Sequence, residues 1–372
     1  MNSSYEYSRH ERFLRRRRRR RIKRIVTAAV SIVIVLLIAA IVIGIAVAFI
    51  NRHNRQDTVP EQNGNEISEE RGQTSDVPSS ETGVPGETQE SAATVSNEPE
   101  PEPENEPVTE KIVLQAEDIH IGGLILVNRH HFYEHIGEDK MIDVFTYKSS
   151  AYKFRDTDMY LRPEAAERLN AMLVDFYKET NNGTVNIIST YRDLATQQRI
   201  YDSKLDYYGS AEKAEKWVAL PGASEHHTGL AVDLGIYTDD GESYDYNGEG
   251  EFAWINRNCW KYGFIVRYSS EKTDITGIAY EPWHFRYLGL PHAEIISGTD
   301  FCYEEYMGYL KAYPYEGDHL FFESESCGKY EIFYLRSQGD TTEFELPKGS
   351  DYSVSGNNID GFIVTVRLNG DS

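Results

Sequence analysis

The fold of this 372-residue chain is decided by the stretch SEHHTGLAVD, residues 224–233, read together with EPWH at residues 281–284. The first stretch runs into a short apolar segment in which Asp233 stands between Val232 and Leu234, as on a buried β-strand. A carboxylate on such a strand is costly to bury unless a cation or a metal ion compensates its charge. The two stretches therefore predict a polar site built inside an apolar frame.

The same residues supply the groups that a catalytic zinc site requires. His226 and Asp233 offer two ligands, and His284 offers a third from the second stretch. Three protein ligands leave one position open for water, and a carboxylate that does not bind the metal accepts the proton of that water. Glu281 is the candidate for this base. The residues predict one Zn²⁺ per site and a hydrolase, with no need for the neighbouring His227 as a ligand.

Other sequence patterns that could serve catalysis or metal binding are less complete. The segment HFYEH, residues 131–135, fits an inverted zincin motif, but that motif requires a helix of several turns and a glycine follows almost at once. Ser224, with His226 and Asp233, has the residue types of a serine hydrolase, yet it lacks the G-x-S-x-G turn. The acidic segment 239–251 lacks the closing glutamate of an EF-hand calcium loop, which favours a solvated loop.

The charge of the chain is distributed very unevenly. The net charge is -22, but residues 1–24 contain ten Arg and one Lys against two Glu. An acidic body with a short basic end argues against nucleic acid as the main partner. Residues 25–50 carry no charge and are long enough for a transmembrane helix, which needs about 20 apolar residues. A cleaved signal peptide fits less well, because its apolar part has only about 7–15 residues.

The basic flank predicts a single-pass protein of the cell membrane, with residues 1–24 in the cytoplasm and the rest of the chain outside. Residues 51–111 are rich in Pro and Glu and have no hydrophobic period, so we expect a disordered linker. A folded domain is expected over residues 112–297, and a small β-rich extension over residues 298–372.

Helical and strand patterns mix along the folded part without a regular βαβ alternation, which predicts an α+β domain with a small mixed or antiparallel sheet and flanking helices. The expected helices are residues 163–180, 195–208, 254–262 and 303–310. The expected strands are residues 124–128, 185–189, 231–234, 264–268 and 284–287, with 330–335 and 362–367 in the extension. The three cysteines show no metal-binding spacing, and a bridge between Cys302 and Cys327 is left open.

The pattern S-x-H-x-x-G-x-A-x-D at residues 224–233, with the later E-x-W-H, resembles the VanY-like D-alanyl-D-alanine carboxypeptidases of the LAS zinc peptidases. Residues 189–193 (STYRD), followed by Gln197, resemble an upstream motif of this family. Residues 263–268 resemble its approach to the last motif. The resemblance covers residues 119–295, with the motifs in the family's order and spacing.

The resemblance implies a role for each matching residue of the metal site. His226, Asp233 and His284 would hold Zn²⁺. Glu281 would be the general base that activates the zinc water and later protonates the leaving amine. Arg192 would face the substrate carbonyl or the terminal carboxylate and stabilise the charge that develops there.

On the substrate side, the resemblance implies that Ser224 and Gln197 hydrogen-bond the end of the peptide and that Trp283 packs beside the site. Two positions depart from the family pattern. Thr190 stands where glycine is common, and Asp193 stands where serine is common. The added carboxylate lies next to the catalytic arginine, so we expect it to influence how firmly a substrate carboxylate is held.

The apolar segment 25–50 and the resemblance together predict a membrane-anchored zinc carboxypeptidase, in a Gram-positive bacterium. Its substrate would be the peptidoglycan stem peptide, from which it would remove the terminal D-Ala through a zinc-activated water. An L,D-carboxypeptidase acting on tetrapeptide stems shares these motifs and is left open. So is a non-catalytic wall-binding domain, although a purely structural zinc site needs no free base. The linker fits a domain that reaches the wall from the membrane.

Overall fold

The computed structural model describes residues 108–135 and 140–368. The expected cytoplasmic tail, the expected membrane helix and most of the expected linker lie outside the described residues. Among the residues that are described, no helix combines the length and the apolar character that a membrane crossing requires. The membrane helix at residues 25–50 therefore stays a prediction from sequence.

The central domain is built on a six-stranded mixed sheet. Its strands run in the order β3 (Lys153–Phe154), β5 (Val185–Ser189), β6 (Ala231–Tyr237), β9 (Glu281–Tyr287) and β8 (Phe264–Tyr268), and β7 (Ser243–Asp245) pairs with β6. The β3–β5 pair is parallel, and the other pairs are antiparallel. Two short strands, β2 (Ile142–Asp143) and β4 (Tyr160–Leu161), form a separate antiparallel pair. The sheet is of the mixed kind expected for this α+β domain.

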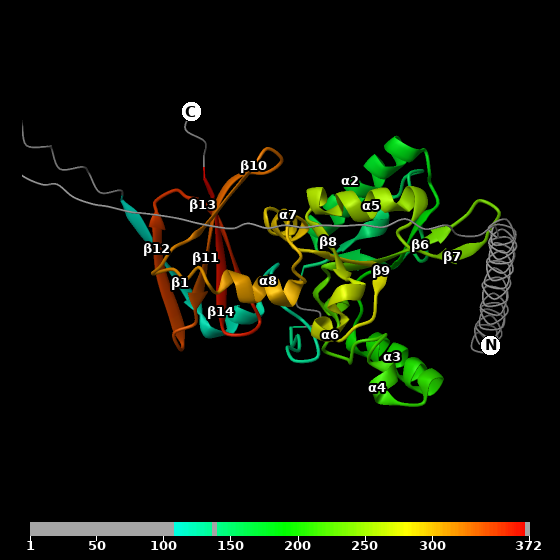
Figure 1. The fold of residues 1–372 in the computed structure, drawn as a ribbon, viewed down its shortest axis with the longest axis horizontal. Helices are drawn as coiled ribbons and strands as arrows, with labels where there is room; N and C mark the ends of the chain where they lie inside the picture. The colour runs from blue at the N-terminus through cyan, green and yellow to red at the C-terminus, as the bar shows by residue number, and fades with distance from the viewer. Residues whose placement is uncertain (1–107, 136–139, 369–372) are drawn as a thin grey trace, which may run out of the picture. The chain divides into compact units, whose positions relative to one another are not determined.

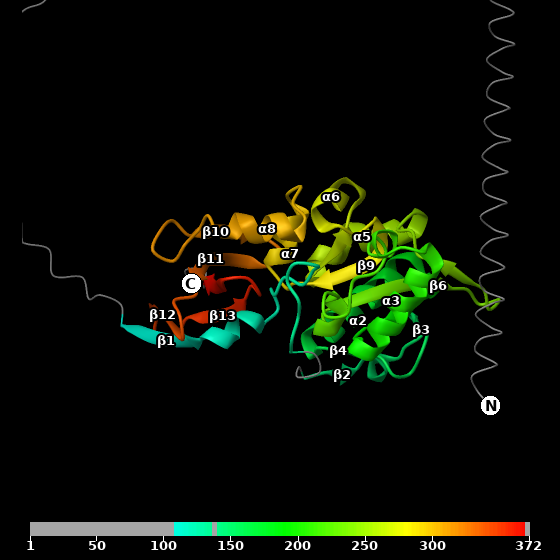
Figure 2. The same cartoon turned by 90° about the horizontal axis from the view of Figure 1, so that it is seen from below.

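Helices cover both faces of this sheet. On one side lie α2 (Pro163–Thr180) and α5 (Ala253–Asn258), and on the other lie α3 (Leu194–Tyr208) and α4 (Ala211–Ala214), as Figure 1 shows. The view from below in Figure 2 places α3 in front of α2, in agreement with this layering. The short helix α6 (Thr273–Thr276) follows β8 along the chain.

The amphipathic character of α2 decides which face of the sheet becomes the core. A proline occupies its first turn, and its buried residues are Ala165, Ala166, Leu169, Met172, Leu173 and Phe176. These side chains share one core with Val232, Leu234 and Phe285 of the sheet. Asp233 and His284 alternate with those strand residues, so their side chains lie on the opposite face. That second face carries the candidate site.

The C-terminal extension consists of helices on a β-sandwich. It contains α8 (Tyr303–Leu310), which follows α7 (His292–Ser297), and an antiparallel sheet in the order β10 (Leu320–Ser324), β11 (Gly328–Arg336), β14 (Gly361–Leu368) and β13 (Asp351–Gly356). One face of this sheet packs on α7 and α8, and the other packs on the pair of β12 (Thr341–Pro347) and β1 (Thr109–Gln115). Residues 361–366 of β14 are all buried, as is usual for a strand covered on both faces.

The expected boundary between linker and central domain is corrected by β1. The sequence places residues 109–111 in the linker and residue 112 at the start of the domain, yet all of them lie in β1. This strand pairs with β12 along its whole length, from Thr109 opposite Pro347 to Gln115 opposite Thr341. In the sequence, the central domain therefore lies between β1 and β12, two strands that pair with each other.

The segment 124–128, expected as a strand, does not join a sheet. Its apolar side chains are buried, but its backbone groups bond to loops and side chains. Leu124 N donates to Ser355 Oγ at 2.8 Å, Leu126 N donates to Asn357 O at 3.2 Å, and Ile125 O accepts from Arg286 Nη2 at 3.0 Å. The apolar run was a valid sign of burial but not of strand pairing.

The bridge left open between Cys302 and Cys327 does not form. These two residues and Cys259 are free thiols, and all three are buried. Burial raises the pKa of the Cys259 thiol to about 12 and that of Cys302 to about 11. The cysteines are therefore packing residues of low reactivity.

Candidate active site

Two neighbouring strands and one turn bring the predicted metal ligands together. Asp233 of β6 and His284 of β9 lie directly opposite each other in antiparallel register, so their side chains share one face. His226 lies in the 3₁₀ turn η3 (Glu225–Thr228), from which Gly229 leads into β6 with a left-handed backbone (φ 67°). One ligand atom from each of the three residues lies within 4.8 Å of the others. In the described part of the chain, this is the one group of its kind.

The lone pairs of these groups fit a metal cation. His226 Nδ1 donates to the carbonyl of Thr190 at 2.6 Å, so the lone pair of this ring is on Nε2. That Nε2 is buried and has no hydrogen-bond partner among the described residues, although Asp233 Oδ2 lies only 3.1 Å away. Two lone-pair atoms at this distance require a positive charge between them. A proton does not supply it at neutral pH, because burial, with Arg192 nearby, lowers the pKa of His226 to about 4.

His284 completes the donor set. Its Nδ1 lies 2.9 Å from Asp233 Oδ1, and its Nε2 lies 3.3 Å from Glu225 Oε2. Burial acts to lower the pKa of His284, but the hydrogen bonds to these two carboxylates raise it to about 9. A ring whose Nε2–H is held by a carboxylate offers Nδ1 to a metal ion once Nδ1 loses its proton. Two imidazoles and one carboxylate suit a catalytic zinc site with an open position.

Glu281 joins this site through an irregularity in β9. Tyr268 of β8 pairs with Glu281 whereas Val266 pairs with Phe285, so β9 has two extra residues between these pairs. Bulges of this kind redirect side chains beside active sites. Burial is the main cause that raises the pKa of Glu281 to about 7. A carboxyl group with this pKa can accept a proton near neutral pH and return it later.

Arg192 follows β5 in the turn that leads to α3. Burial lowers the pKa of its guanidinium, while the nearby carboxylates of Asp233 and Glu281 act in the opposite direction. Its Nε is buried and has no hydrogen-bond partner among the described residues. The turn itself is fixed, because His227 Nδ1 donates to the carbonyl of Arg192 at 2.6 Å. A buried donor without a protein partner beside a candidate base is suited to bind a substrate oxygen.

The two positions that depart from the expected pattern serve the local structure. Asp193 is exposed and caps α3, and its carboxylate accepts a hydrogen bond from Thr196 N at 2.7 Å. The hydrogen bond from Thr196 lowers the pKa of Asp193. Thr190 is buried and provides the carbonyl that orients His226. The carboxylate of Asp193 is thus engaged by a helix N-terminus, which serine at this position would also cap.

The predicted substrate-side residues occupy three different settings. Gln197 is buried, its Nε2 donates to Ala219 O at 2.7 Å, and its Oε1 has no partner among the described residues. Ser224 is buried just before η3, where its carbonyl accepts from His227 N. Trp283 packs against the core on the face opposite the metal ligands. Ser224 therefore adjoins the ligand turn, Gln197 fixes the segment that leads to it, and Trp283 supports the sheet from the core side.

Among the described residues, no histidine outside the site belongs to a group that could hold a metal ion. His227 donates from Nδ1 to the Arg192 carbonyl and accepts at Nε2 from Gly222 N at 3.0 Å, so both of its nitrogens are engaged. The HFYEH segment, residues 131–135, is not helical, and its histidines lie outside the described group of three. The inverted zincin motif therefore has no structural basis in this segment.

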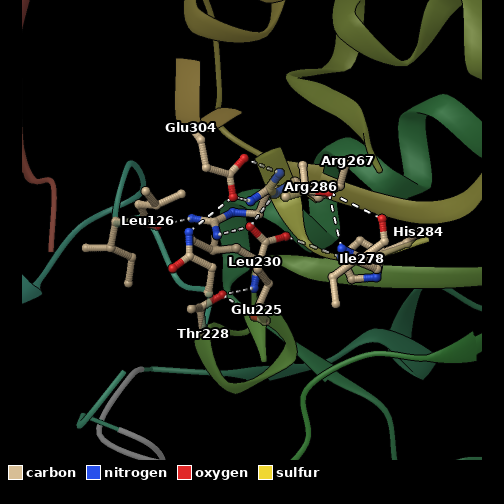
Figure 3. A network of polar contacts seen from close by, with 12 residues as sticks. Leu126, Glu225, Thr228, Leu230, Arg267, Ile278, His284, Arg286 and Glu304 are labelled. Carbon is tan, nitrogen blue, oxygen red and sulfur yellow. Dashed lines mark hydrogen bonds and ion pairs between the residues drawn. The ribbon is translucent and has the colours of Figure 1, made fainter. Parts of the chain in front are cut away.

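A cluster of buried charged residues lies beside the metal ligands, and it was not predicted from the sequence. Glu225 lies between Arg267 of β8 and Arg286 of β9, with its Oε1 at 2.8 Å from Arg267 Nε and 3.2 Å from Arg286 Nη1 (Figure 3). None of the three side chains has exposed surface. The sequence did carry a signal, since each arginine interrupts an apolar strand where a buried guanidinium needs a partner.

A carboxyl group whose pKa lies near neutrality, beside a set of metal ligands, is suited above all to activating water. The site therefore defines a metal-dependent hydrolase. Residues 158–290 match VanY, the family of D-alanyl-D-alanine carboxypeptidases. Over 263 residues the chain is 35% identical to a D-alanyl-D-alanine carboxypeptidase of Enterococcus faecium, a match that covers 69% of this chain and 79% of that protein. The chain therefore belongs to the VanY family of D-alanyl-D-alanine carboxypeptidases, which confirms the expected resemblance.

Two further relatives show the same kinship. The chain is 36% identical over 160 residues to the bifunctional D-Ala-D-Ala dipeptidase and D-Ala-D-Ala carboxypeptidase VanXYC of Enterococcus gallinarum, which covers 42% of this chain and 82% of that protein. Among solved structures, the vancomycin resistance D,D-dipeptidase VanXYg, in complex with a D-Ala-D-Ala phosphinate analog, is 35% identical. It matches with a TM-score of 0.62 over 70% of this chain and 99% of its own. A match of this extent is longer than the central domain alone.

Proposed function

We propose that this chain is a zinc-dependent D,D-carboxypeptidase that removes the terminal D-Ala from peptidoglycan stem peptides. The observation that carries the proposal is the buried pair of lone-pair atoms, His226 Nε2 and Asp233 Oδ2, beside the Glu281 carboxyl group of raised pKa. The names of the relatives, a D-alanyl-D-alanine carboxypeptidase and a D-Ala-D-Ala dipeptidase and carboxypeptidase, support the substrate class.

Each residue of the site has a distinct task in this reaction. His226, Asp233 and His284 would hold the zinc ion, which when bound lowers the pKa of water and polarises a carbonyl. Glu281 accepts the proton of the attacking water and returns it to the amine of the leaving D-Ala as the C–N bond breaks. Arg192 donates hydrogen bonds to the carbonyl oxygen, where negative charge develops, or to the terminal carboxylate.

Cleavage should depend on both the metal and the D-Ala-D-Ala end. The purified full-length protein is expected to release D-Ala from a stem pentapeptide, to lose this activity to a zinc chelator, and to regain it on addition of Zn²⁺. Mass spectrometry of muropeptides before and after digestion identifies the bond that is cut. A chelator already saturated with zinc is the control. An active preparation that contains no metal would contradict the proposal.

The same assay separates the other functions that sequence leaves open. Release of D-Ala only from a tetrapeptide would identify an L,D-carboxypeptidase. Cleavage of the free dipeptide D-Ala-D-Ala as well would identify the dual activity that the name of VanXYC describes. Retention of the protein on peptidoglycan without any cleavage would identify a wall-binding domain. The pentapeptide is the expected substrate because the relatives are named as enzymes that act on D-alanyl-D-alanine or D-Ala-D-Ala, the end that a stem pentapeptide carries.

The pH dependence of kcat/KM should follow the ionisation of Glu281. The base must be ionised to accept a proton, so activity should rise with pH through its pKa and fall below it. Burial raises this pKa to about 7, and a bound cation favours the ionised form and lowers it again. We expect an acid limb with its midpoint between the ordinary value for Glu, about 4.3, and about 7. Activity that stays constant down to about pH 4, below that ordinary value, would contradict this role.

We also propose that the protein is held at the cell membrane by residues 25–50, with the catalytic domain outside. The absence of charge over this stretch and the basic residues before it support the proposal. Membrane fractionation, with protease added to intact cells, tests it. The domain should be degraded from outside and should stay with the membrane in high salt. Recovery of a shorter, soluble protein in the medium would indicate a cleaved signal peptide instead.

A further inference from the structure

We propose that Glu304, on α8 of the C-terminal extension, is a positioning residue of the active site. It completes a buried chain of charges that runs through Arg267 and Glu225 to the metal ligand His284 (Figure 3). The inference rests on the proposed metal site but not on the identity of the peptide. It gives the extension a part in the chemistry that the sequence motifs do not assign to it.

The inner end of the chain sets the orientation of His284. A neutral imidazole has one N–H and one lone pair, and the partner of one nitrogen decides the role of the other. Glu225 Oε2, at 3.3 Å from Nε2, accepts the N–H there and leaves Nδ1 to face Asp233 at 2.9 Å. Carboxylates that hold a ligand histidine in this way fix its tautomer and its ring orientation.

Glu225 is itself held by two arginines. Its carboxylate is fully buried, and its Oε1 contacts both Arg267 Nε and Arg286 Nη1. The attraction of the two arginines, acting against burial, keeps the pKa of Glu225 well below its usual range. Two arginines against one carboxylate leave an excess positive charge in a site without exposed surface, and such a charge is costly unless it is paired.

Glu304 supplies the missing negative charge. Its two oxygens form a bidentate pair with Arg267, at 2.9 Å from Nη1 and 2.6 Å from Nη2. Asn128 Nδ2 also donates to Glu304 Oε1, at 3.1 Å. Arg267 therefore uses Nε for Glu225 and both terminal nitrogens for Glu304. A guanidinium held on both edges by carboxylates has a single orientation. It therefore fixes the position of the Glu225 carboxylate.

The residue before Glu304 contacts the same two arginines. The guanidinium carbons of Arg267 and Arg286 lie 5.5 Å and 5.4 Å from the ring centroid of Tyr303, a distance typical of cation–π contacts. Two consecutive residues of α8 thus cover the charge cluster, one with an aromatic ring and one with a carboxylate. This arrangement indicates a built contact and not a chance approach of a surface helix.

The extension holds α8 in place through its own core. Tyr306, Met307 and Leu310 of α8 are buried in one cluster with Ile332 of β11 and Ile363 of β14. The position of Glu304 is therefore set by the C-terminal sheet. The two β-strands that carry Arg267 and Arg286 belong to the central domain, so the chain of charges joins the two parts of the fold at the metal site.

The test measures metal binding, which does not depend on the substrate. Glu304→Gln in the full-length protein should bind Zn²⁺ about 10-fold more weakly in competition with a chromophoric chelator. It should also change the visible spectrum of the Co²⁺-substituted protein, which reports ligand geometry. In a Glu225→Gln background, Glu304→Gln should have no further effect on Zn²⁺ affinity, because the two residues act through one chain. Circular dichroism checks that the variants are folded.

Lys311→Gln is the matched control, since it removes another ion pair, which joins the end of α8 to the turn between β13 and β14. Lys311 Nζ lies 2.8 Å from Asp360 Oδ2, and neither residue reaches the metal ligands. This variant should keep wild-type Zn²⁺ affinity and the wild-type Co²⁺ spectrum.

Glu304→Asp keeps the charge but is too short to keep both hydrogen bonds, so we expect an intermediate loss of Zn²⁺ affinity. If Glu304→Gln does not fold, this variant decides the question. Wild-type metal binding by a folded Glu304→Gln or Glu304→Asp protein would overturn the inference. An inactive wild-type protein with the expected metal-binding pattern would overturn only the proposed function.

Discussion

Glu281→Gln is expected to lower kcat by about 10²–10⁴-fold, the range usual for the loss of a general acid–base group. Glutamine keeps the size of the side chain but cannot accept a proton from water. Glu281 is not among the three grouped ligands, so the variant should still bind one zinc ion. Steady-state kinetics on a stem pentapeptide, with metal analysis of the same sample, measures both properties.

The raised pKa of Glu281 makes this test specific. Burial raises its pKa to about 7, whereas an exposed glutamate is ionised throughout the neutral range. Glu212→Gln on α4 is a suitable control, because Glu212 is exposed and the same chemical change is made there. The control should keep wild-type kcat. A fully active Glu281→Gln enzyme would show that another group accepts the proton.

Arg192→Lys is expected to lower kcat/KM by about 10²–10³-fold, as the loss of one donor to a developing charge usually does. Lysine keeps the positive charge but lacks the planar set of donors that binds a carboxylate or carbonyl oxygen along an edge. The Nε of Arg192 is buried and has no partner among the described residues, so the structure holds this donor ready for a substrate.

The division of that loss between kcat and KM identifies the substrate group. A rise in KM with little change in kcat would show that Arg192 binds the terminal carboxylate equally in ground and transition states. A fall in kcat alone would show that it stabilises the charge on the carbonyl oxygen. A substrate amidated at its C-terminus supplies the control, since a carboxylate role predicts that wild type and variant cleave it equally slowly. Wild-type kinetics for Arg192→Lys would remove the residue from the site.

Local patterns predicted the elements that hold the site. The expected helix 163–180 and the expected strands 185–189 and 264–268 agree with α2, β5 and β8 residue for residue. Each of these elements either has a proline or a glycine at its edge or contains a run of apolar residues that become buried in the core. The expected helix 254–262 is instead divided into α5 and a 3₁₀ turn, η5 (Cys259–Tyr262). Short helices often tighten in this way at their last turn.

The metal-site residues were predictable because their types are rare on apolar strands, and their spacing could be compared with a family. The residues that hold these ligands in place were not predictable. Glu225 stands inside the same motif, but its partner Arg267 is 42 positions away and Glu304, the partner of Arg267, is 79 positions away, and no local pattern connects them. The register of β8 and β9, with its extra residues before His284, likewise depends on tertiary packing. The sequence thus indicates which residues meet but not what keeps them in place.

The pairing of β1 with β12 has a consequence for the order in which the protein is made. Thr109 and Glu345, which hydrogen-bond across this pair, are 236 positions apart. At a synthesis rate of about 5–20 residues per second, β1 waits about 10–50 s for its partner. During this time the strands up to β9 can complete the central sheet. Glu304 is synthesised after all three ligands, so the positive charge of Arg267 and Arg286 can be balanced only after the strands that carry the ligands have been made.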